Sequence, residues 1–276
     1  MKVALITGAS SGIGLVTTVE LARAGFVVLA TMRDVSRRGR LDDALRAAGQ
    51  NAEIRELDVT RHEMVPALID GVMAKHGRID VLVNNAGFAM AGFAEDVSVA
   101  ELREQFETNF FGHVALTKAV LPVMRAQQSG HIIMISSISG RSAPAVLSSY
   151  AASKFALEGW SESLRIECAP LGIKVSLVEP GAFATDIWER NRKIGEAAQS
   201  EASPHRERVV RIKERIDRGL RMGDPVIVAR LITRIAQDAN PRLRYLVGQD
   251  AHVQYWLKAA LPWKLYERVV RKYLGI

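Results

Sequence analysis

Short apolar runs alternate with amphipathic stretches through the first two-thirds of the chain. The runs are rich in Val and Ile and nearly continuous, which is typical of parallel strands that are covered on both faces. They predict strands at Val3–Thr7, Val27–Thr31, Glu53–Leu57, Val81–Asn84, His131–Ser136, Lys174–Glu179 and Arg244–Val247. The amphipathic stretches predict helices at Gly12–Ala24, Arg40–Ala48, Met64–His76, Val99–Arg125, Tyr150–Ala169 and Pro225–Gln237.

This alternation indicates an α/β fold: a doubly wound parallel sheet of the Rossmann type, with helices on both faces and right-handed crossovers. No repeat or linker divides the chain, so we expect residues 1–276 to form a single domain. Two segments differ from the rest. Residues 186–224 are polar and Arg-rich, and we expect them to be a variable segment that covers the substrate. Residues 253–276 form a tail in which apolar and aromatic residues are interleaved with basic ones.

The composition is that of a soluble globular protein, with 48% hydrophobic and 24% charged residues. A single cysteine, Cys168, excludes an intramolecular disulfide framework and a thiolate zinc site. His113 and His131 lack partners at metal-ligand spacing, so no metal is expected. No apolar run is long enough to span a membrane, and Met1 leads into a glycine turn without a cleavage site. These features predict a cytoplasmic location.

The net charge of +7 is concentrated in the last third: from Asp186 onward the chain has 19 basic and 11 acidic residues. Such an excess can meet nucleic acid, an anionic membrane or an acidic substrate, or it can belong to solvated helices. No nucleic-acid-binding module is visible, so we do not expect nucleic acid as a partner. The tail could bind a membrane surface, pack on a second subunit or pack on its own cleft, and peripheral membrane association is kept as an alternative.

Three glycines and two serines connect the first strand to the first helix, in the segment Thr-Gly-Ala-Ser-Ser-Gly-Ile-Gly at residues 7–14. A diphosphate needs close approach of the main chain and free N–H groups at a helix N-terminus. Gly8, Gly12 and Gly14 remove the Cβ atoms that would block that approach. Ser10 and Ser11 can add hydroxyl hydrogen bonds. The spacing differs from Gly-x-Gly-x-x-Gly, and no P-loop lysine follows.

The end of the second strand bears on which dinucleotide binds. Met32 stands where an acid would bind the adenosine ribose, and Arg33 follows it. A guanidinium suits a 2′-phosphate, which favours NADP(H). Asp34 would reach the ribose if the strand were shifted by one residue, so NAD remains the alternative.

Tyr150 and Lys154 are four residues apart and share one helix face. A tyrosine has a pKa of ~10, and a neighbouring cation or an oxidised nicotinamide would stabilise the phenolate. This pair is common by chance and gains meaning only with its surroundings.

With those surroundings, the sequence resembles the short-chain dehydrogenase/reductase family along nearly its whole length. The matching pieces are Thr7–Gly14, Asp58-Val59, Asn84-Asn85-Ala86-Gly87, Asn109, Ser137, Tyr150, Lys154 and Pro180-Gly181-Ala182-Phe183-Ala184-Thr185. Each falls at the carboxyl end of a strand or on a helix, where an open α/β sheet binds its ligand. At the subgroup level, the strand end Ala30–Asp34, the long segment after Thr185 and the stretch Arg244–Gly248 resemble the hydroxysteroid and retinol dehydrogenases.

The resemblance implies a role for each matching residue. Tyr150 would be the general acid/base, Lys154 would bind the nicotinamide ribose, Ser137 would bind the substrate oxygen, and Asn109 would hold a water in the proton relay. The implied cofactor-binding residues are Gly8, Ser10, Ser11, Gly12, Ile13, Gly14, Arg33, Asp58, Val59, Asn85, Ala86, Gly87, Tyr150, Lys154, Pro180, Gly181, Phe183 and Thr185. A homodimer or homotetramer is also implied.

Three segments should frame the substrate end of the cleft, at residues 88–93, 138–147 and 183–188. They are mainly apolar, with Arg141 and Asp186 as their few charges. Such a wall suits a lipophilic alcohol or carbonyl compound that is steroid-, retinoid- or fatty-acyl-like. The alternative function is a non-catalytic NADP(H)-binding sensor or scaffold, because fold alone does not establish catalysis.

Overall fold

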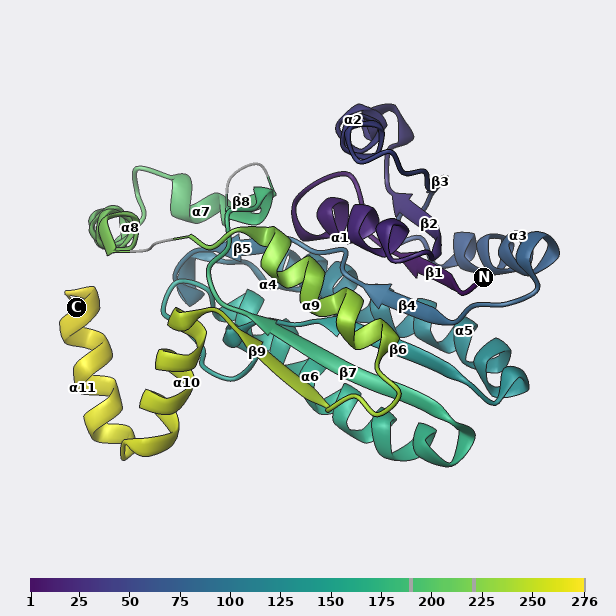
Figure 1. The fold of residues 1–276 in the computed structure, drawn as a ribbon. Helices are drawn as coiled ribbons and strands as arrows, with labels where there is room; N and C mark the ends of the chain where they lie inside the picture. Colours follow the sequence, from purple (N-terminus) through teal and green to yellow (C-terminus); the bar gives the residue numbers. More distant parts are fainter. Residues whose placement is uncertain (189–190, 220–221, 276) are drawn as a thin grey trace.

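The computed structural model describes residues 1–188, 191–219 and 222–275. A central sheet of seven parallel strands has the order β3-β2-β1-β4-β6-β7-β9 (Figure 1). The strands are β1 (Val3–Ile6), β2 (Val27–Met32), β3 (Glu53–Glu56), β4 (Val81–Asn84), β6 (Gly130–Ile135), β7 (Ile173–Pro180) and β9 (Arg244–Val247). The predicted strands are therefore confirmed, and no end differs by more than one residue. The order reverses at β1, so the crevice between the carboxyl ends of β1 and β4 is the expected ligand position.

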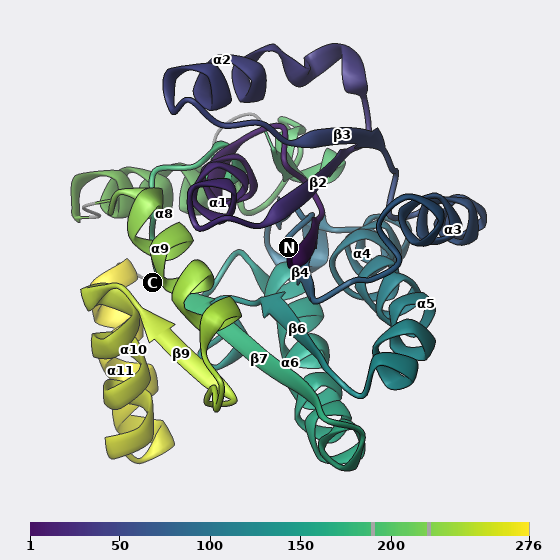
Figure 2. The same ribbon diagram turned by 45° about the vertical axis from the view of Figure 1, so that its right-hand side comes forward.

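Helices cover both faces of this sheet (Figures 1 and 2). One face is covered by α1 (Gly12–Arg23), α2 (Gly39–Ala47) and α9 (Pro225–Gln237), and the other by α3 (Val65–His76), α5 (Gly112–Gln127) and α6 (Ser148–Cys168). Each face has its own cluster of buried side chains, built from the Val, Ile and Leu residues of the strands and the inner sides of the helices. The predicted single-domain, doubly wound fold is confirmed.

Local sequence signals place several helix ends. Gly77 has a φ of +69° and ends α3 in the left-handed conformation that favours glycine. Asp224 accepts a hydrogen bond from the Val226 N–H and so caps α9, which begins at Pro225. Ser98 and Glu101 form a capping box at the start of α4 (Val99–Phe106).

The prediction of one helix over Val99–Arg125 was wrong in its middle. There α4 gives way to a π-helical turn at Glu107–Phe111, and α5 follows it. Such turns re-aim side chains within a helix and are frequent at functional sites. Periodicity did not reveal it, because one extra residue shifts the apolar stripe only slightly.

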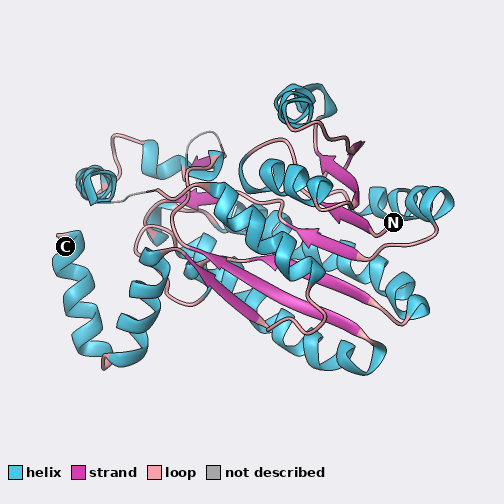
Figure 3. Cartoon of the chain, in the orientation of Figure 1, coloured by secondary structure: helices cyan, strands magenta, loops and turns pink. Residues whose placement is uncertain are grey.

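The segment that sequence analysis left without elements is partly regular. It holds β8 (Arg192–Ile194), α7 (Glu196–Gln199) and α8 (Arg206–Gly219). Strand β8 pairs in parallel with β5 (Ala89–Ala91) and forms a second, two-stranded sheet. The tail is a hairpin of α10 (Gln249–Ala260) and α11 (Trp263–Leu274) beyond β9 (Figure 3). Among the described residues, none of the helices has the length and apolar character to cross a membrane.

Candidate active site

The turn between β1 and α1 presents main chain at the carboxyl end of the sheet. Gly8 and Gly12 have φ angles of +70° and +54°, which residues with a Cβ rarely adopt. A Cβ on Gly14 would lie 2.2 Å from the Gly8 carbonyl oxygen. Gly14 therefore allows the helix to begin directly against the turn. Ser11 precedes α1 without making a side-chain capping bond, so its hydroxyl does not occupy the N–H groups of the first turn.

Side chains brace this turn against the end of β4. The Asn85 side chain donates from Nδ2 to the Thr7 carbonyl oxygen at 2.8 Å. In return, Thr7 Oγ1 accepts from the main-chain N–H groups of Asn85 at 3.0 Å and Ala86 at 2.9 Å. Two neighbouring strand ends are thus held together by neutral hydrogen bonds, which makes the crevice rigid before any ligand enters it.

The end of β2 matches the expected register. Met32 is buried in the last position of the strand, and Arg33 follows it. Asp34 accepts hydrogen bonds from both the main-chain N–H and the hydroxyl of Ser36, at 2.9 and 2.6 Å. These bonds and the neighbouring Arg37 and Arg33 lower the pKa of Asp34. The carboxylate is therefore engaged as a cap, and Asp34 lines the cleft together with Arg33 and Arg37.

One cleft of about 300 Å³ brings nearly all of the predicted site residues together. Asn109 and Gly14 are the exceptions. Gly14 acts through packing, and Asn109 is completely buried behind the cleft wall. The predicted residues that line the cleft are Gly8, Ser10, Ser11, Gly12, Ile13, Arg33, Asp58, Val59, Asn85, Ala86, Gly87, Ser137, Tyr150, Lys154, Pro180, Gly181, Phe183 and Thr185.

Tyr150 and Lys154 lie on the first turns of α6, and Ser137 follows β6. All three side chains are buried. A hydrogen bond joins the side chains of Tyr150 and Ser137. Lys154 Nζ lies 5.7 Å from the centroid of the Tyr150 ring and donates to the Ile135 carbonyl oxygen at 2.8 Å. The structure therefore places a phenol, a hydroxyl and an ammonium beside one another at the end of β6.

Burial dominates the acid–base properties of this group. It raises the pKa of Tyr150 to about 12, although the hydrogen bond with Ser137 acts in the opposite direction. It lowers the pKa of Lys154 to about 8, against the effect of the negative Glu158 one turn away. Without a bound cation, burial thus outweighs the lowering of the tyrosine pKa that the sequence suggested. Tyr150 is then a neutral phenol at physiological pH and holds a proton that it can donate.

Asn109 lies in the π-helical turn and holds the loop after β4. Its Oδ1 accepts from the Phe88 N–H at 3.1 Å, and its Nδ2 donates to the Phe88 carbonyl oxygen at 3.0 Å. Gln105, one turn earlier, donates to the same oxygen and accepts from the Met90 N–H at 2.7 Å. Sequence analysis missed Gln105. Its spacing of four residues from Asn109 was the available signal.

The substrate end of the cleft is more polar than expected. Phe88, Phe183 and Ile187 line it, but so do Glu104 and Lys193, which form an ion pair with each other. The Lys193 ammonium also lies 5.1 Å from the centroid of the Phe88 ring. Arg141, expected at this wall, is not among the residues that line the cleft. The Trp188 side chain, also expected there, lies outside the described part of the structure.

Histidines serve the fold in this region. His113 Nε2 lies 2.7 Å from the Ala86 carbonyl oxygen, and burial lowers the His113 pKa to about 3. The neutral ring therefore donates its Nε2–H to that oxygen and supports the loop from below. Within residues 1–188, 191–219 and 222–275 there is no group of three or more His, Cys, Asp or Glu side chains that could hold a metal.

A doubly wound sheet with a glycine turn and a tyrosine–lysine pair in one cleft defines a dinucleotide-dependent oxidoreductase. Residues 2–194 match the model of the short chain dehydrogenase family. The chain belongs to the short-chain dehydrogenase/reductase family and is an oxidoreductase.

Similar proteins span the whole chain. It is 39% identical over 277 residues to an uncharacterized oxidoreductase of Bacillus subtilis (YusZ), covering 99% of this chain and 98% of that one. A 3-ketodihydrosphingosine reductase of Bacteroides thetaiotaomicron is 36% identical, covering 100% and 98%. Retinol dehydrogenase 8 of Bos taurus is 44% identical over 190 residues, which are 67% of this chain and 60% of that one. These relatives confirm the resemblance to retinol dehydrogenases.

Solved structures share the fold. A short-chain dehydrogenase of Streptomyces avermitilis has a TM-score of 0.81 at 37% identity and covers 99% of both chains. A metagenomic short-chain oxidoreductase in complex with NADP has a TM-score of 0.71 at 30% identity, covering 89% and 96%. A short-chain dehydrogenase/reductase of Burkholderia phymatum in complex with NAD has a TM-score of 0.80 at 28% identity, covering 94% and 93%.

Proposed function

We propose that this protein is an NADP(H)-dependent oxidoreductase that interconverts a primary or secondary alcohol and a carbonyl group on a lipophilic substrate. The observation that carries the proposal is the position of Tyr150, Ser137 and Lys154 in the same cleft as the glycine turn. A proton donor, a hydrogen-bond donor for the substrate oxygen and a fixed cation thus surround one reacting position.

The residues of the cleft fit a dinucleotide. A Cβ at Gly8 would lie 2.9 Å from Ala86 Cα, so only a bare main chain leaves the cradle open for a diphosphate. Arg33 and Arg37 would hold a 2′-phosphate, and the engagement of Asp34 by Ser36 supports this choice. Asp58 accepts from the Thr60 N–H and hydroxyl, which fixes its carboxylate at the edge of the adenine position. NAD remains the alternative cofactor, since relatives of this fold bind one or the other.

The cofactor supplies the hydride when it is bound. In the reductive direction Tyr150 donates its proton to the carbonyl oxygen, and Ser137 donates a hydrogen bond that stabilises the negative charge developing there. Lys154 binds the ribose hydroxyls with N–H groups that its contact with Ile135 leaves available, since an ammonium has three donors. In the oxidative direction Tyr150 takes the alcohol proton, helped by the neighbouring positive charges.

Asn109 is the fourth residue of the proposed catalytic group, and it is buried behind the residues that line the cleft. Its side chain fixes the Phe88 main chain, and we assign to this residue the relay water that carries protons between Lys154 and solvent. Gln105 also fixes the main chain of Phe88, by donating a hydrogen bond to its carbonyl oxygen.

The substrate class rests on the cleft and on two relatives. Phe88, Phe183 and Ile187 provide apolar surface next to Tyr150. Retinol and ketodihydrosphingosine, named in two of the relatives, are long lipophilic molecules. Residues 186–224 would cover the bound substrate, because Ile187, Asn191 and Lys193 line the cleft while β8 pairs with β5. The Lys193–Glu104 pair adds a polar anchor at the far end.

A parallel screen tests this function. Steroid, retinoid, long-chain fatty-acyl and aromatic ketones would be offered with NADPH and with NADH, and turnover followed at the nicotinamide absorbance. We expect turnover of a long apolar ketone with NADPH preferred. Binding of NADPH without turnover of any ketone or alcohol would instead favour the sensor or scaffold function, against which the complete set of Asn109, Ser137, Tyr150 and Lys154 argues.

The outer surface supports two proposals about partners. Exposed Phe111, Phe155 and Ile166 on the helical face opposite the sheet support a homodimer or homotetramer. In the tail, Trp256 and Trp263 are 63% and 65% exposed beside basic side chains, which supports peripheral contact with an anionic membrane for a protein otherwise placed in the cytoplasm. The inner face of the tail, by contrast, packs on its own molecule: Tyr266 and Ser142 share a hydrogen bond of 2.7 Å.

A further inference from the structure

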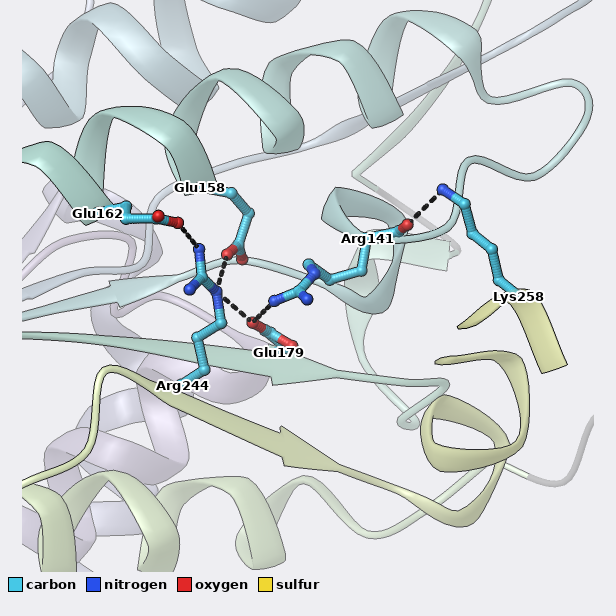
Figure 4. Close-up of polar contacts among 6 residues, drawn as sticks. All are labelled: Arg141, Glu158, Glu162, Glu179, Arg244 and Lys258. Carbon is cyan, nitrogen blue, oxygen red and sulfur yellow. Dashed lines mark hydrogen bonds and ion pairs between the residues drawn. The ribbon is translucent and has the colours of Figure 1, made fainter. Parts of the chain in front are cut away.

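Two acidic side chains, shown in Figure 4, are buried on elements that lead into or carry the site: Glu158 on α6 and Glu179 on β7. Glu158 lies one turn after Lys154 on α6, and Glu179 precedes Pro180 at the end of β7. Their side chains are only 6% and 3% exposed. Both carboxyl groups contact the same arginine, Arg244, so they lie close together. Two buried acids this close cannot both ionise without cations nearby.

Two arginines supply those cations. Arg244 Nε lies 3.0 Å from Glu158 Oε2 and 3.4 Å from Glu179 Oε1, and its Nη2 reaches the exposed Glu162 at 2.6 Å. Arg141 Nη1 lies 3.5 Å from Glu179 Oε1. Burial and the charge of Glu158 still raise the pKa of Glu179 to about 7, against both arginines. Glu179 therefore keeps its proton to a higher pH than an ordinary glutamate does, and Arg141 lies within reach of its Oε1.

Arg141 belongs to the loop that starts at Ser137. This loop has two ties to the end of β7 that lie side by side: Ser137 Oγ donates to the Pro180 carbonyl oxygen at 3.5 Å, and Arg141 contacts the preceding residue, Glu179. The catalytic hydroxyl and the guanidinium are thus joined to adjacent positions of one strand. A shift of the loop at Arg141 would be felt at Ser137.

The opposite side of the same loop is held by the tail. The Arg141 guanidinium lies 5.1 Å from the centroid of the Tyr255 ring, within range of a cation–π contact. The Arg141 carbonyl oxygen accepts from Lys258 Nζ at 2.6 Å (Figure 4). Arg141 therefore stands between β7 and α10, and contacts both.

We propose that Arg141 is the positioning residue of the Ser137 loop, and that it links the catalytic serine to the C-terminal hairpin through Glu179 on one side and Tyr255 and Lys258 on the other. The inference rests on the proposed function, because Ser137 matters for turnover only if the cleft is catalytic. It gives the inner face of the tail a role in catalysis that is separate from any contact of its outer face.

The test compares Arg141→Met with Arg141→Lys, and uses Glu162→Gln as the matched control. Glu162 belongs to the same cluster but is 57% exposed, and its salt bridge is with Arg244 rather than with Arg141. With a ketone that the protein reduces, we expect Arg141→Met to lower kcat roughly tenfold, since small displacements of catalytic groups are costly. The Kd for NADPH should stay within about twofold, because Arg141 does not line the cleft. Arg141→Lys should recover part of kcat, and Glu162→Gln should match the wild type.

A measurement without substrate separates this inference from the proposed function. Amide hydrogen exchange of residues 138–147 and 251–258 should be faster in Arg141→Met than in the wild type, and unchanged in Glu162→Gln. Equal exchange in Arg141→Met, or a wild-type kcat in that variant, would overturn the positioning role. If Tyr150→Phe kept full turnover while exchange still rose in Arg141→Met, the proposed function would fail and the structural link would stand.

Discussion

The ammonium of Lys154 is fixed by the main chain of Ile135: Nζ donates to that carbonyl oxygen at 2.8 Å. The bond holds the lysine at the end of β6, with its Nζ 5.7 Å from the centroid of the Tyr150 ring. The charge is therefore placed before a ligand arrives, and the contact leaves two of its three N–H donors for other partners. A site in which the cation is already anchored needs little rearrangement when the cofactor binds.

Tyr150→Phe removes the proton donor and leaves the ring. We expect kcat to fall by about 10²–10⁴-fold, the usual contribution of general acid–base catalysis. NADPH affinity should stay within a few-fold, since the glycine turn and Arg33 are untouched. Fluorescence titration with NADPH, beside steady-state rates, makes the comparison. Turnover at the wild-type rate would contradict the role of the tyrosine.

Arg33→Ser tests the choice of dinucleotide. Loss of a charge-assisted bond to a 2′-phosphate should raise the KM for NADPH by about 10-fold or more and leave the KM for NADH nearly unchanged. Arg46→Ser is a suitable control, because that side chain is 77% exposed, forms its salt bridge with Asp43, which is 75% exposed, and does not line the cleft. An equal loss for both cofactors would speak against the phosphate contact.

Gly14→Ala should damage the turn itself. The new Cβ would lie 2.2 Å from the Gly8 oxygen and 2.5 Å from Asn85 Nδ2, so the brace to β4 must open. We expect a loss of about 1–3 kcal/mol in the free energy of unfolding, as for other overpacked positions. Gly71→Ala, in helix α3 with nothing within 4 Å of the new Cβ, should be neutral or stabilise by about 0.5–1 kcal/mol. Denaturant unfolding of the two variants checks both signs, and NADPH binding should weaken only in the first.

Glu179 predicts a pH dependence of stability with an unusual sign. Its pKa lies above the ordinary value of 4.5, at about 7, because burial and Glu158 favour the protonated form more than Arg141 and Arg244 oppose it. The folded protein binds this proton more tightly than the unfolded chain does. The resulting stabilisation is complete below the unfolded pKa and is lost as the pH rises through the folded pKa.

Glu179→Gln removes this titration and imitates the protonated acid. Relative to the wild type, the variant's Tm should therefore rise by a few degrees between about pH 5 and about pH 8. Arg244 lowers the pKa of Glu162 below its ordinary value of 4.5, so the stabilisation by this group is lost only as the pH falls below that value. Glu162→Gln should therefore show no rise in Tm relative to the wild type between about pH 5 and about pH 8. Parallel thermal unfolding curves for wild type and Glu179→Gln at every pH would contradict the raised pKa of Glu179.

The outer face of the tail predicts a lipid preference. The wild type should sediment with vesicles that contain anionic lipid and far less with zwitterionic ones, since both apolar insertion and positive charge contribute. Replacing Trp256 and Trp263 by Ser should abolish pelleting without changing the Kd for NADPH, because neither side chain lines the cleft. Pelleting that is equal for both proteins would remove the membrane proposal.

The sequence was sufficient for what depends on local pattern. Continuous Val/Ile runs predicted the seven strands of the main sheet, and short motifs at strand ends predicted most residues of the cleft. The three-residue strands β5 and β8 are too short for any periodicity, and their pairing depends on main-chain bonds between distant segments. The π-helical turn around Asn109 was likewise hidden in an apparently regular helix.

The direction in which a side chain points is the second feature that the sequence could not predict. Arg141 is close in sequence to Ser137 and was expected at the substrate wall, but Glu179 and Tyr255, both far away in the chain, draw its guanidinium to the other side. Lys193 reaches the cleft because β8 pairs with β5, and there it meets Glu104 of α4. Each of these contacts joins residues that are far apart in the sequence, so no pattern within a single segment predicts it.

The brace between Thr7 and Asn85 has a consequence for how such a protein can diversify. Its hydrogen bonds join the glycine turn after β1 to the end of β4, and none of them involves residues 186–224. The segment that corresponds to residues 186–224 can therefore be exchanged to suit other substrates, while the affinity for the dinucleotide stays unchanged.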